Sequence, residues 1–192
     1  MAYVTLADQK VWMSIGSTAN DTVLSACIAA AQAFIEMSTG RVFEVSTDTA
    51  KTLDAIADVS KDGYTLRLHY DLASATNVTN GDGVVVASTQ YVTFPATGPI
   101  SELKLLHSSG KAWTYTTDPE NAISIAGKWG YSTTAPAEIV HAAKIIAAQM
   151  YAQKENPSDA DRIVSSDGVV IVPSTIPRIA ADILRKYRRI SF

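Results

Sequence analysis

The sequence has few of the residues from which reaction centres and covalent cross-links are built. Its 192 residues include one cysteine, Cys27, and three histidines, His69, His107 and His141. A single cysteine excludes an intrachain disulfide, and no Cys/His spacing matches a metal site. The histidines lie far apart in the sequence, and none has a cysteine or carboxylate partner at ligand spacing. The sequence therefore predicts no metal site and no cofactor, and it offers no catalytic constellation.

Long hydrophobic runs and targeting segments are also lacking. No run approaches the roughly 18 apolar residues that are needed to cross a bilayer. Residues 1–10 do not show the basic stretch followed by an apolar stretch that is typical of a secretory signal. We therefore expect a soluble protein without a membrane partner, made in a reducing cytoplasm.

Glycine-rich loops that bind phosphate are missing as well. The sequence has neither a Gly-x-Ser-x-Gly nucleophile elbow nor a phosphate loop followed by Lys-Ser/Thr. Residues 80–83, Asn-Gly-Asp-Gly, lie between two alternating stretches and lack the other ligands of a calcium loop. Since Asn-Gly and Asp-Gly tolerate positive φ, these residues indicate a hairpin turn.

Positive charge is scarce except near the end of the sequence. Residues 1–132 hold 8 Lys and Arg against 13 Asp and Glu, whereas residues 133–192 hold 8 against 6. A basic segment on an acidic body is typical of contact with phosphate or with an acidic protein surface. Alternatively, the cations complement the dipole at a helix end. After Ile176 only Asp182 opposes Arg178, Arg185, Lys186, Arg188 and Arg189.

Helical periodicity is strong at both ends of the chain. Residues 21–39 place apolar side chains at the i, i+3/i+4 and i+7 positions, and Gly40 can end that helix in a left-handed conformation. Pro136 opens a second long helix that reaches residue 155, and Pro177 opens a basic helix over residues 178–189. A short helix over residues 6–14 is expected to be capped by Thr5 and anchored by Leu6, Val11 and Trp12.

Between the long helices the period changes from 3.6 to 2, which is typical of strands. We expect short strands that include 41–45, 64–70, 75–79, 84–87, 91–94, 102–106, 113–116 and 123–125.

The predicted fold is therefore of the α+β class: a bundle of three to four helices with an inserted antiparallel β-sandwich or barrel-like subdomain. The helical domain would comprise residues 1–40 and 132–192, and the β-rich subdomain residues 41–131. A polar stretch, 159–167, and a short extended apolar segment, 168–173, would link the last two helices.

Four stretches in this order resemble the head–tail connector (adaptor) proteins of tailed double-stranded-DNA bacteriophages. They are YVTLADQKVWMSI followed by NDTVLSACIAAAQAFIEMSTGRVFE, then VTNGDGVVV, then IAGKWGYS with APAEIVHAAKIIAAQMYAQKE, and last IPRIAADILRKYRRI. Together they cover most of the chain. The sequence differs from the smallest, mostly helical members in its β-rich insertion, whose place the resemblance does not define.

The resemblance implies a structural protein of the virion, located at the head–tail interface, assembled in the host cytoplasm and without enzymatic activity. It implies a homo-oligomeric ring, usually a dodecamer, below the portal protein and above a downstream tail or stopper protein. Packaged double-stranded DNA would pass through the channel of this ring. The terminal segment of such proteins commonly docks on the portal, which assigns portal binding to Arg178, Arg185, Lys186, Arg188 and Arg189.

Three alternatives stay open at this point. The basic terminal helix could make the chain a nucleic-acid-binding module, with an affinity that falls steeply with salt. The chain could also be another head-completion or tail component, or a small enzyme that uses His141. On the connector hypothesis, a deletion after Ser174 is expected to fold and to fail in portal binding.

Overall fold

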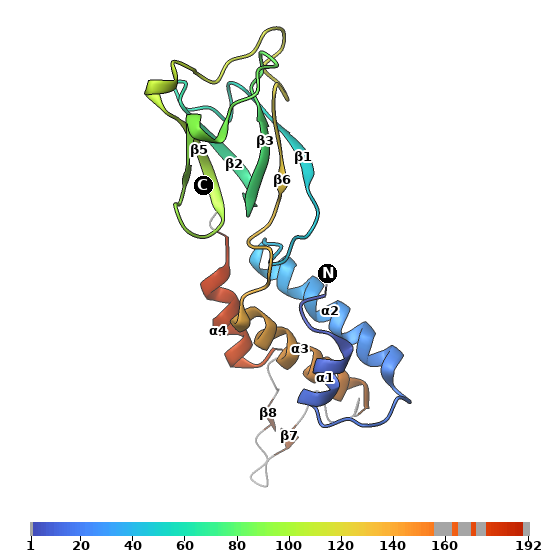
Figure 1. Ribbon diagram of the computed structural model, residues 1–192. Helices are drawn as coiled ribbons and strands as arrows, with labels where there is room; N and C mark the ends of the chain where they lie inside the picture. Colours follow the sequence, from blue (N-terminus) through green and yellow to red (C-terminus); the bar gives the residue numbers. More distant parts are fainter. Residues whose placement is uncertain (1, 156–162, 165–169, 172–175, 190–192) are drawn as a thin grey trace. The chain divides into compact units, whose positions relative to one another are not determined.

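The computed structural model describes residues 2–155, 163–164, 170–171 and 176–189, and it divides the chain into two compact units (Figure 1). Residues 42–134 form a β unit, and residues 2–41 together with 135–192 form a helical unit. The predicted linker segments 159–167 and 168–173 lie mostly outside the described residues. Within them, β7 (Ile163–Val164) and β8 (Val170–Ile171) pair as antiparallel strands.

The β unit consists of two small antiparallel sheets (Figure 1). One sheet has the order β1-β6-β3 and the other the order β2-β5-β4. Residues 42–134 contain no closed barrel, so that alternative of the prediction is wrong. The strands are β1 (Thr49–Leu53), β2 (Thr65–Leu72), β3 (Ser74–Thr79), β4 (Tyr91–Phe94), β5 (Ile100–Leu105) and β6 (Ile123–Lys128).

Both sheets contribute to one hydrophobic core. Alternate residues of a strand point to the same face, and this is why β6 buries Ile123 and Ile125 while its intervening residues are half-buried. The opposite sheet supplies leucines that are almost completely buried. The shared core residues include Leu66, Leu72, Leu103, Leu105, Ile123 and Ile125.

Three predicted strands are absent, and one was missed. Residues 84–87 form no strand, although Asn80 N donates to Val84 O and Val86 N donates to Val78 O across the turn. Residues 42–45 make only two backbone hydrogen bonds to residues 131–132, from Tyr131 N to Val42 O and from Val45 N to Ser132 O, so they run beside that segment without forming a ladder. Residues 113–116 bond singly to different segments, including Trp113 N to Gly63 O. β1 was missed because it is a polar edge strand in which only Leu53 is buried.

The helical unit contains α1 (Leu6–Trp12), α2 (Asp21–Thr39), α3 (Ala137–Glu155) and α4 (Arg178–Tyr187). α3 packs against both α2 and α4. As predicted, Gly40 ends α2 in a left-handed conformation, with φ of 66° and its N–H on Glu36 O. The buried apolar residues of the bundle include Leu24, Ile28, Ala31, Ile35, Ile139, Ala142, Ala143, Ile146, Ala147, Tyr151, Ala180 and Leu184.

The predicted apolar anchor of α1 is wrong for two of its three residues. Val11 is 81% exposed and Trp12 is 44% exposed, whereas Gln9 is completely buried. The Gln9 side chain donates a hydrogen bond from Nε2 to the Lys144 carbonyl of α3 at 3.0 Å. Polar contacts therefore determine which side of α1 faces the bundle.

Thr5 caps α1 as expected, because its Oγ1 accepts a hydrogen bond from Asp8 N at 3.1 Å. Thr5→Ala should lower the free energy of unfolding of the helical unit by about 1 kcal/mol, since it removes the partner of an amide in the first turn. Urea unfolding followed by circular dichroism measures the change. Thr5→Ser keeps the accepting oxygen and serves as the control, and an equal loss in both variants would contradict the cap.

α2 is long and apolar enough, by length and composition alone, to cross a membrane. Its 18-residue window has a mean hydropathy of 1.3, and 28% of that window is buried. The sequence-based expectation that no segment approaches this limit was too strong, because it counted uninterrupted apolar runs and α2 includes small and polar residues. A core helix of a soluble protein passes the same criterion, and α2 contributes four buried apolar residues to the bundle.

Candidate docking surface on the last helix

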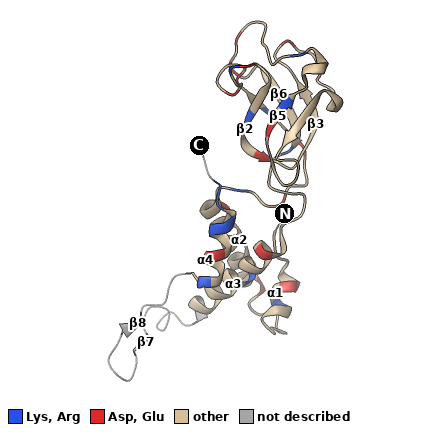
Figure 2. Cartoon of the chain, turned by 90° about the vertical axis from the view of Figure 1, so that its left-hand side faces the viewer, with Lys and Arg blue, Asp and Glu red and all other residues tan. Residues whose placement is uncertain are grey.

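α4 carries the candidate site and is held in place by its apolar side. Ala180 and Leu184 are buried in the helical unit, and the Pro177 carbonyl accepts the first helical hydrogen bond, from Ala181 N at 3.0 Å. Figure 2 shows the basic residues along this helix. Three of the five predicted residues lie within α4, and Arg188 and Arg189 follow its end.

Arg178, Arg185 and Arg188 are exposed. The Arg185 side chain is 80% exposed and lies 3.4 Å from Asp182, which is one helical turn away and also exposed. An ion pair of this kind is heavily screened by water and contributes little to stability. These three guanidinium groups are consequently available to a partner surface, and Arg is suited to bidentate contacts with carboxylate or phosphate.

Lys186 is instead engaged within the helical unit. Its Nζ lies 3.1 Å from both carboxylate oxygens of Glu138 on α3, and the Tyr187 hydroxyl donates to Glu138 Oε2 at 2.8 Å. The hydrogen bond from Tyr187, followed by that from Lys186, lowers the pKa of Glu138. This cluster ties the end of α4 to the start of α3.

Arg189 also contributes to the helical unit. Its backbone N–H donates to Thr39 O, the last residue of α2, at 2.8 Å. This hydrogen bond satisfies a carbonyl that a helix end leaves without an intrahelical partner. The segment after α4 thus completes the C-terminus of α2.

These contacts change the result that we expect from the deletion after Ser174, because the deletion removes α4. Removing α4 would expose the surfaces that Ala180 and Leu184 cover, and it would take away the partners of Glu138 and Thr39. The truncated chain would then fail to bind for reasons of stability alone. Substitution of the exposed arginines separates binding from folding.

The hydrogen bonds to Glu138 should make the stability of the helical unit depend on pH. Because the folded-state pKa of Glu138 is lowered, its contribution is present above the ordinary glutamate pKa of about 4.3 and is lost as the pH falls through the folded-state pKa. Wild type should be more stable than Glu138→Gln at pH 7, and the difference should shrink as the pH falls below the ordinary glutamate pKa. Urea unfolding at several pH values measures this. Tyr187→Phe should reduce the difference, and a pH-independent difference would contradict the role of the carboxylate.

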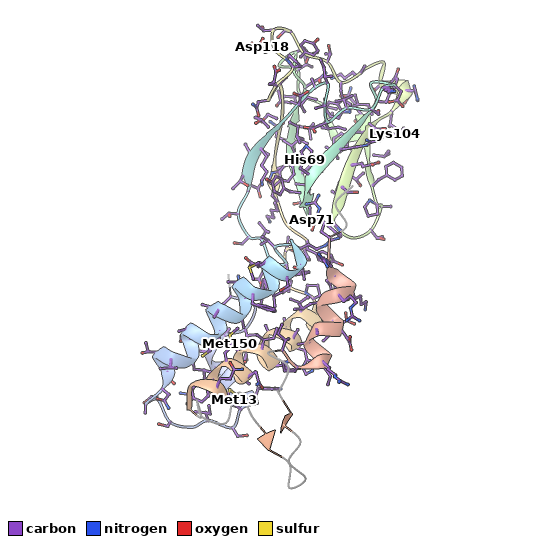
Figure 3. The ribbon with its side chains drawn as sticks, turned by 180° about the vertical axis from the view of Figure 1, so that it is seen from behind. Met13, His69, Asp71, Lys104, Asp118 and Met150 are labelled. Carbon is purple, nitrogen blue, oxygen red and sulfur yellow. The ribbon has the colours of Figure 1, made fainter. Side chains whose placement is uncertain are left out.

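Elsewhere, the structure brings one histidine to a carboxylate that the sequence did not indicate. His69 Nε2 on β2 lies 2.5 Å from Asp58 Oδ1, and Asp58 Oδ2 accepts from Asp54 N at 2.8 Å (His69 is labelled in Figure 3). Asp58 is buried and thereby connects residues 54–58 to β2. The His107 ring lies against the Tyr64 ring, with centroids 4.0 Å apart and planes tilted by 42°, and His141 lies exposed on α3.

Among the described residues, no group of three or more His, Cys, Asp or Glu side chains could hold a metal ion. The His69–Asp58 pair was missed because the hairpin-like return of the chain, and not sequence spacing, brings residue 58 beside β2, where Arg67 N donates to Asp58 O at 2.8 Å. The surface that the sequence predicted on α4 stays the candidate site.

The fold is similar to a chain of the structure described as "Neck of empty GTA particle computed with C6 symmetry", with a TM-score of 0.60 and 17% identity over 99% of this chain and 91% of that one. It is also similar to a chain of "Virion of native gene transfer agent (GTA) particle", with a TM-score of 0.58 and 16% identity over the same shares. No curated protein matched the sequence.

The fold and the matches define a class, the structural proteins of phage-like virions. The sequence matches the head completion protein family over residues 2–190. The chain belongs to this family and is a virion protein of the head–tail region. The resemblance to phage connector proteins is confirmed.

Proposed function

We propose that the chain is a ring-forming subunit that completes the head below the portal, extends the DNA channel and joins the head to the tail. The observation that carries this proposal is the family match across residues 2–190. The role is structural, with the two units providing surfaces and the chain performing no reaction.

Charge supports passage of DNA through the ring. The β unit, residues 42–134, has 6 Lys and Arg against 10 Asp and Glu, a net charge of −4, and the whole chain has −3. Phosphate contacts with clustered cations are strongly attractive, so a neutral or acidic wall lets a duplex move. The twelve copies that the resemblance implies are compatible with the sixfold symmetry with which the similar neck structure was computed.

The portal contact is assigned to α4. Arg178, Arg185 and Arg188 present exposed positive charge to an acidic portal surface, and Lys186 and Arg189 hold α4 in its place on α3 and α2. The downstream tail or stopper protein would bind another face of the ring. Membranes have no part in this function.

Reconstitution tests the proposal. Heads assembled without this protein should gain a ring-shaped layer at the portal vertex when the purified protein is added, and they should then accept tails. Electron microscopy of the neck measures both results. Heads that become complete without such a layer would refute the ring, and duplex binding that falls steeply with salt in the absence of heads would favour the nucleic-acid-binding alternative.

A further inference from the structure

α1 buries a polar side chain and exposes two apolar ones. Surface helices normally bury apolar residues and expose polar ones. Here Gln9 is completely buried, while Val11 is 81% exposed and Trp12 is 44% exposed. The buried Gln9 Oε1 has no hydrogen-bond partner among the described residues, which is unfavourable for stability. A helix that served only to stabilise this chain would be turned the other way.

The orientation of α1 is fixed at several points. Gln9 Nε2 donates to Lys144 O at 3.0 Å, and Lys10 Nζ lies 2.7 Å from Asp21 Oδ1 at the start of α2. Past the end of α1, Met13 N and Ile15 N donate to the Gln9 and Lys10 carbonyls, each at 2.9 Å. Val11 and Trp12 are therefore held on the outside of the helical unit by an ordered turn and are not exposed through fraying.

α2 presents a second uncovered surface in the same unit. Its outer face consists of small residues and one large flexible residue, Met37, which is 77% exposed, and none of them is charged. Small side chains permit close approach of a partner helix or a large side chain. We call this surface the outer face of α2; its residues are Thr22, Ser25, Ala26, Ala29, Ala30, Ala33 and Met37.

Building on the proposed ring, we infer that Val11 and Trp12 of one copy pack against the outer face of α2 in the adjacent copy. The two surfaces are complementary in size, since bulky side chains meet a face of alanines. Neither surface carries a charge, so contact would leave no unpaired ion buried. Two different surfaces on one chain give a head-to-tail contact, and such a contact closes into a ring when the rotation closes.

A second copy explains the exposed apolar surface of both helices. Only 28% of the apolar window of α2 is buried within one chain, and a ring neighbour would cover more of it. A membrane would also favour apolar surface, but the chain is a virion protein of the head–tail region. Contact between two α1 helices would use one surface twice and stop at a dimer.

A charge exchange tests this contact. Val11→Asp should reduce ring occupancy on heads at least tenfold, because it places a charge against the alanines of the neighbour. Adding Ala30→Lys to the same chain should restore much of the loss, since each introduced carboxylate would then meet an introduced lysine of the adjacent copy. Ala19→Asp, exposed and outside both surfaces, is the matched control. Normal occupancy by Val11→Asp, or no recovery in the double variant, would overturn the contact.

Cross-linking identifies the neighbour directly. In a Cys27→Ala background, Val11→Cys combined with Ala30→Cys should give a ladder of cross-linked copies in completed heads treated with a short bis-maleimide. Either cysteine alone should give monomers. Dimers from Val11→Cys alone, or products that contain another virion protein, would overturn this contact while the ring persists. Absence of any ring with the wild-type chain would instead refute the proposed function on which the contact rests.

Discussion

Gly127→Ala is expected to destabilise the β unit strongly. Gly127 lies in β6, between β1 and β3, and a Cβ there would come within 2.2 Å of Ser74 O and 3.1 Å of Ala75 Cα. Backbone atoms of a neighbouring strand cannot move aside without breaking the ladder. Overpacking of this kind destabilises by about 3 kcal/mol, which is a large part of the stability of a small domain.

The loss should appear as a lower urea midpoint of the β unit and as reduced yield of folded protein. Tryptophan fluorescence reports on this unit because Trp113 and Trp129 are both buried in its core. Gly16→Ala is the steric control, since a Cβ at residue 16 would have no atom within 4 Å. If Gly127→Ala unfolds at the wild-type midpoint, the close approach of β3 to β6 is not as described.

Reversing the charge of two exposed arginines, one on α4 and one just after it, is expected to weaken portal binding strongly. The double variant Arg178→Glu and Arg188→Glu changes the net charge by −4 at positions that are exposed, so folding should be unaffected. At the proposed contact, the attraction between the arginines and the acidic portal surface would become repulsion between carboxylates. We expect binding to portals to weaken about 100-fold, equivalent to about 2.7 kcal/mol.

The matched control is Lys61→Glu with Arg67→Glu, which makes the same change in net charge at exposed positions of the β unit. Binding of purified protein to portal-containing heads, measured by co-sedimentation at constant salt, compares the two variants. Equal weakening in both would indicate a general effect of charge. Wild-type binding by the Arg178 and Arg188 variant would remove α4 from the portal contact.

The sequence predicted the helices better than the strands. α2 and α3 have long apolar stripes and distinct ends, and Gly40 marks the end of α2 in sequence and structure alike. β1 could not be predicted from alternation, because the edge strand is mostly exposed and its pairing partner is β6, about seventy residues later. Residues 42–45 show the opposite case, in which alternation is present and only two backbone hydrogen bonds form.

The candidate site was predicted in composition but not in contacts. Three of the five clustered cations lie on α4 and two follow its end, yet nothing local distinguishes Lys186 from Arg185. Glu138, 48 residues away, makes that distinction by binding Lys186 and Tyr187. The orientation of α1 likewise depends on Lys144 O, 135 residues after Gln9. Such long-range polar contacts leave no periodic signal in the sequence.

During synthesis on the ribosome, the β unit is completed before the helical unit. Residues 42–134 are contiguous, so the β unit has all of its strands as soon as this stretch emerges. The helical unit combines residues 2–41 with residues that are synthesised after the β unit. One of its hydrogen bonds, from Arg189 N to Thr39 O, joins the segment after α4 to the end of α2. A polypeptide released by a nonsense mutation just after residue 134 would therefore carry a complete β unit and an unpaired α2, and it could not join a growing neck.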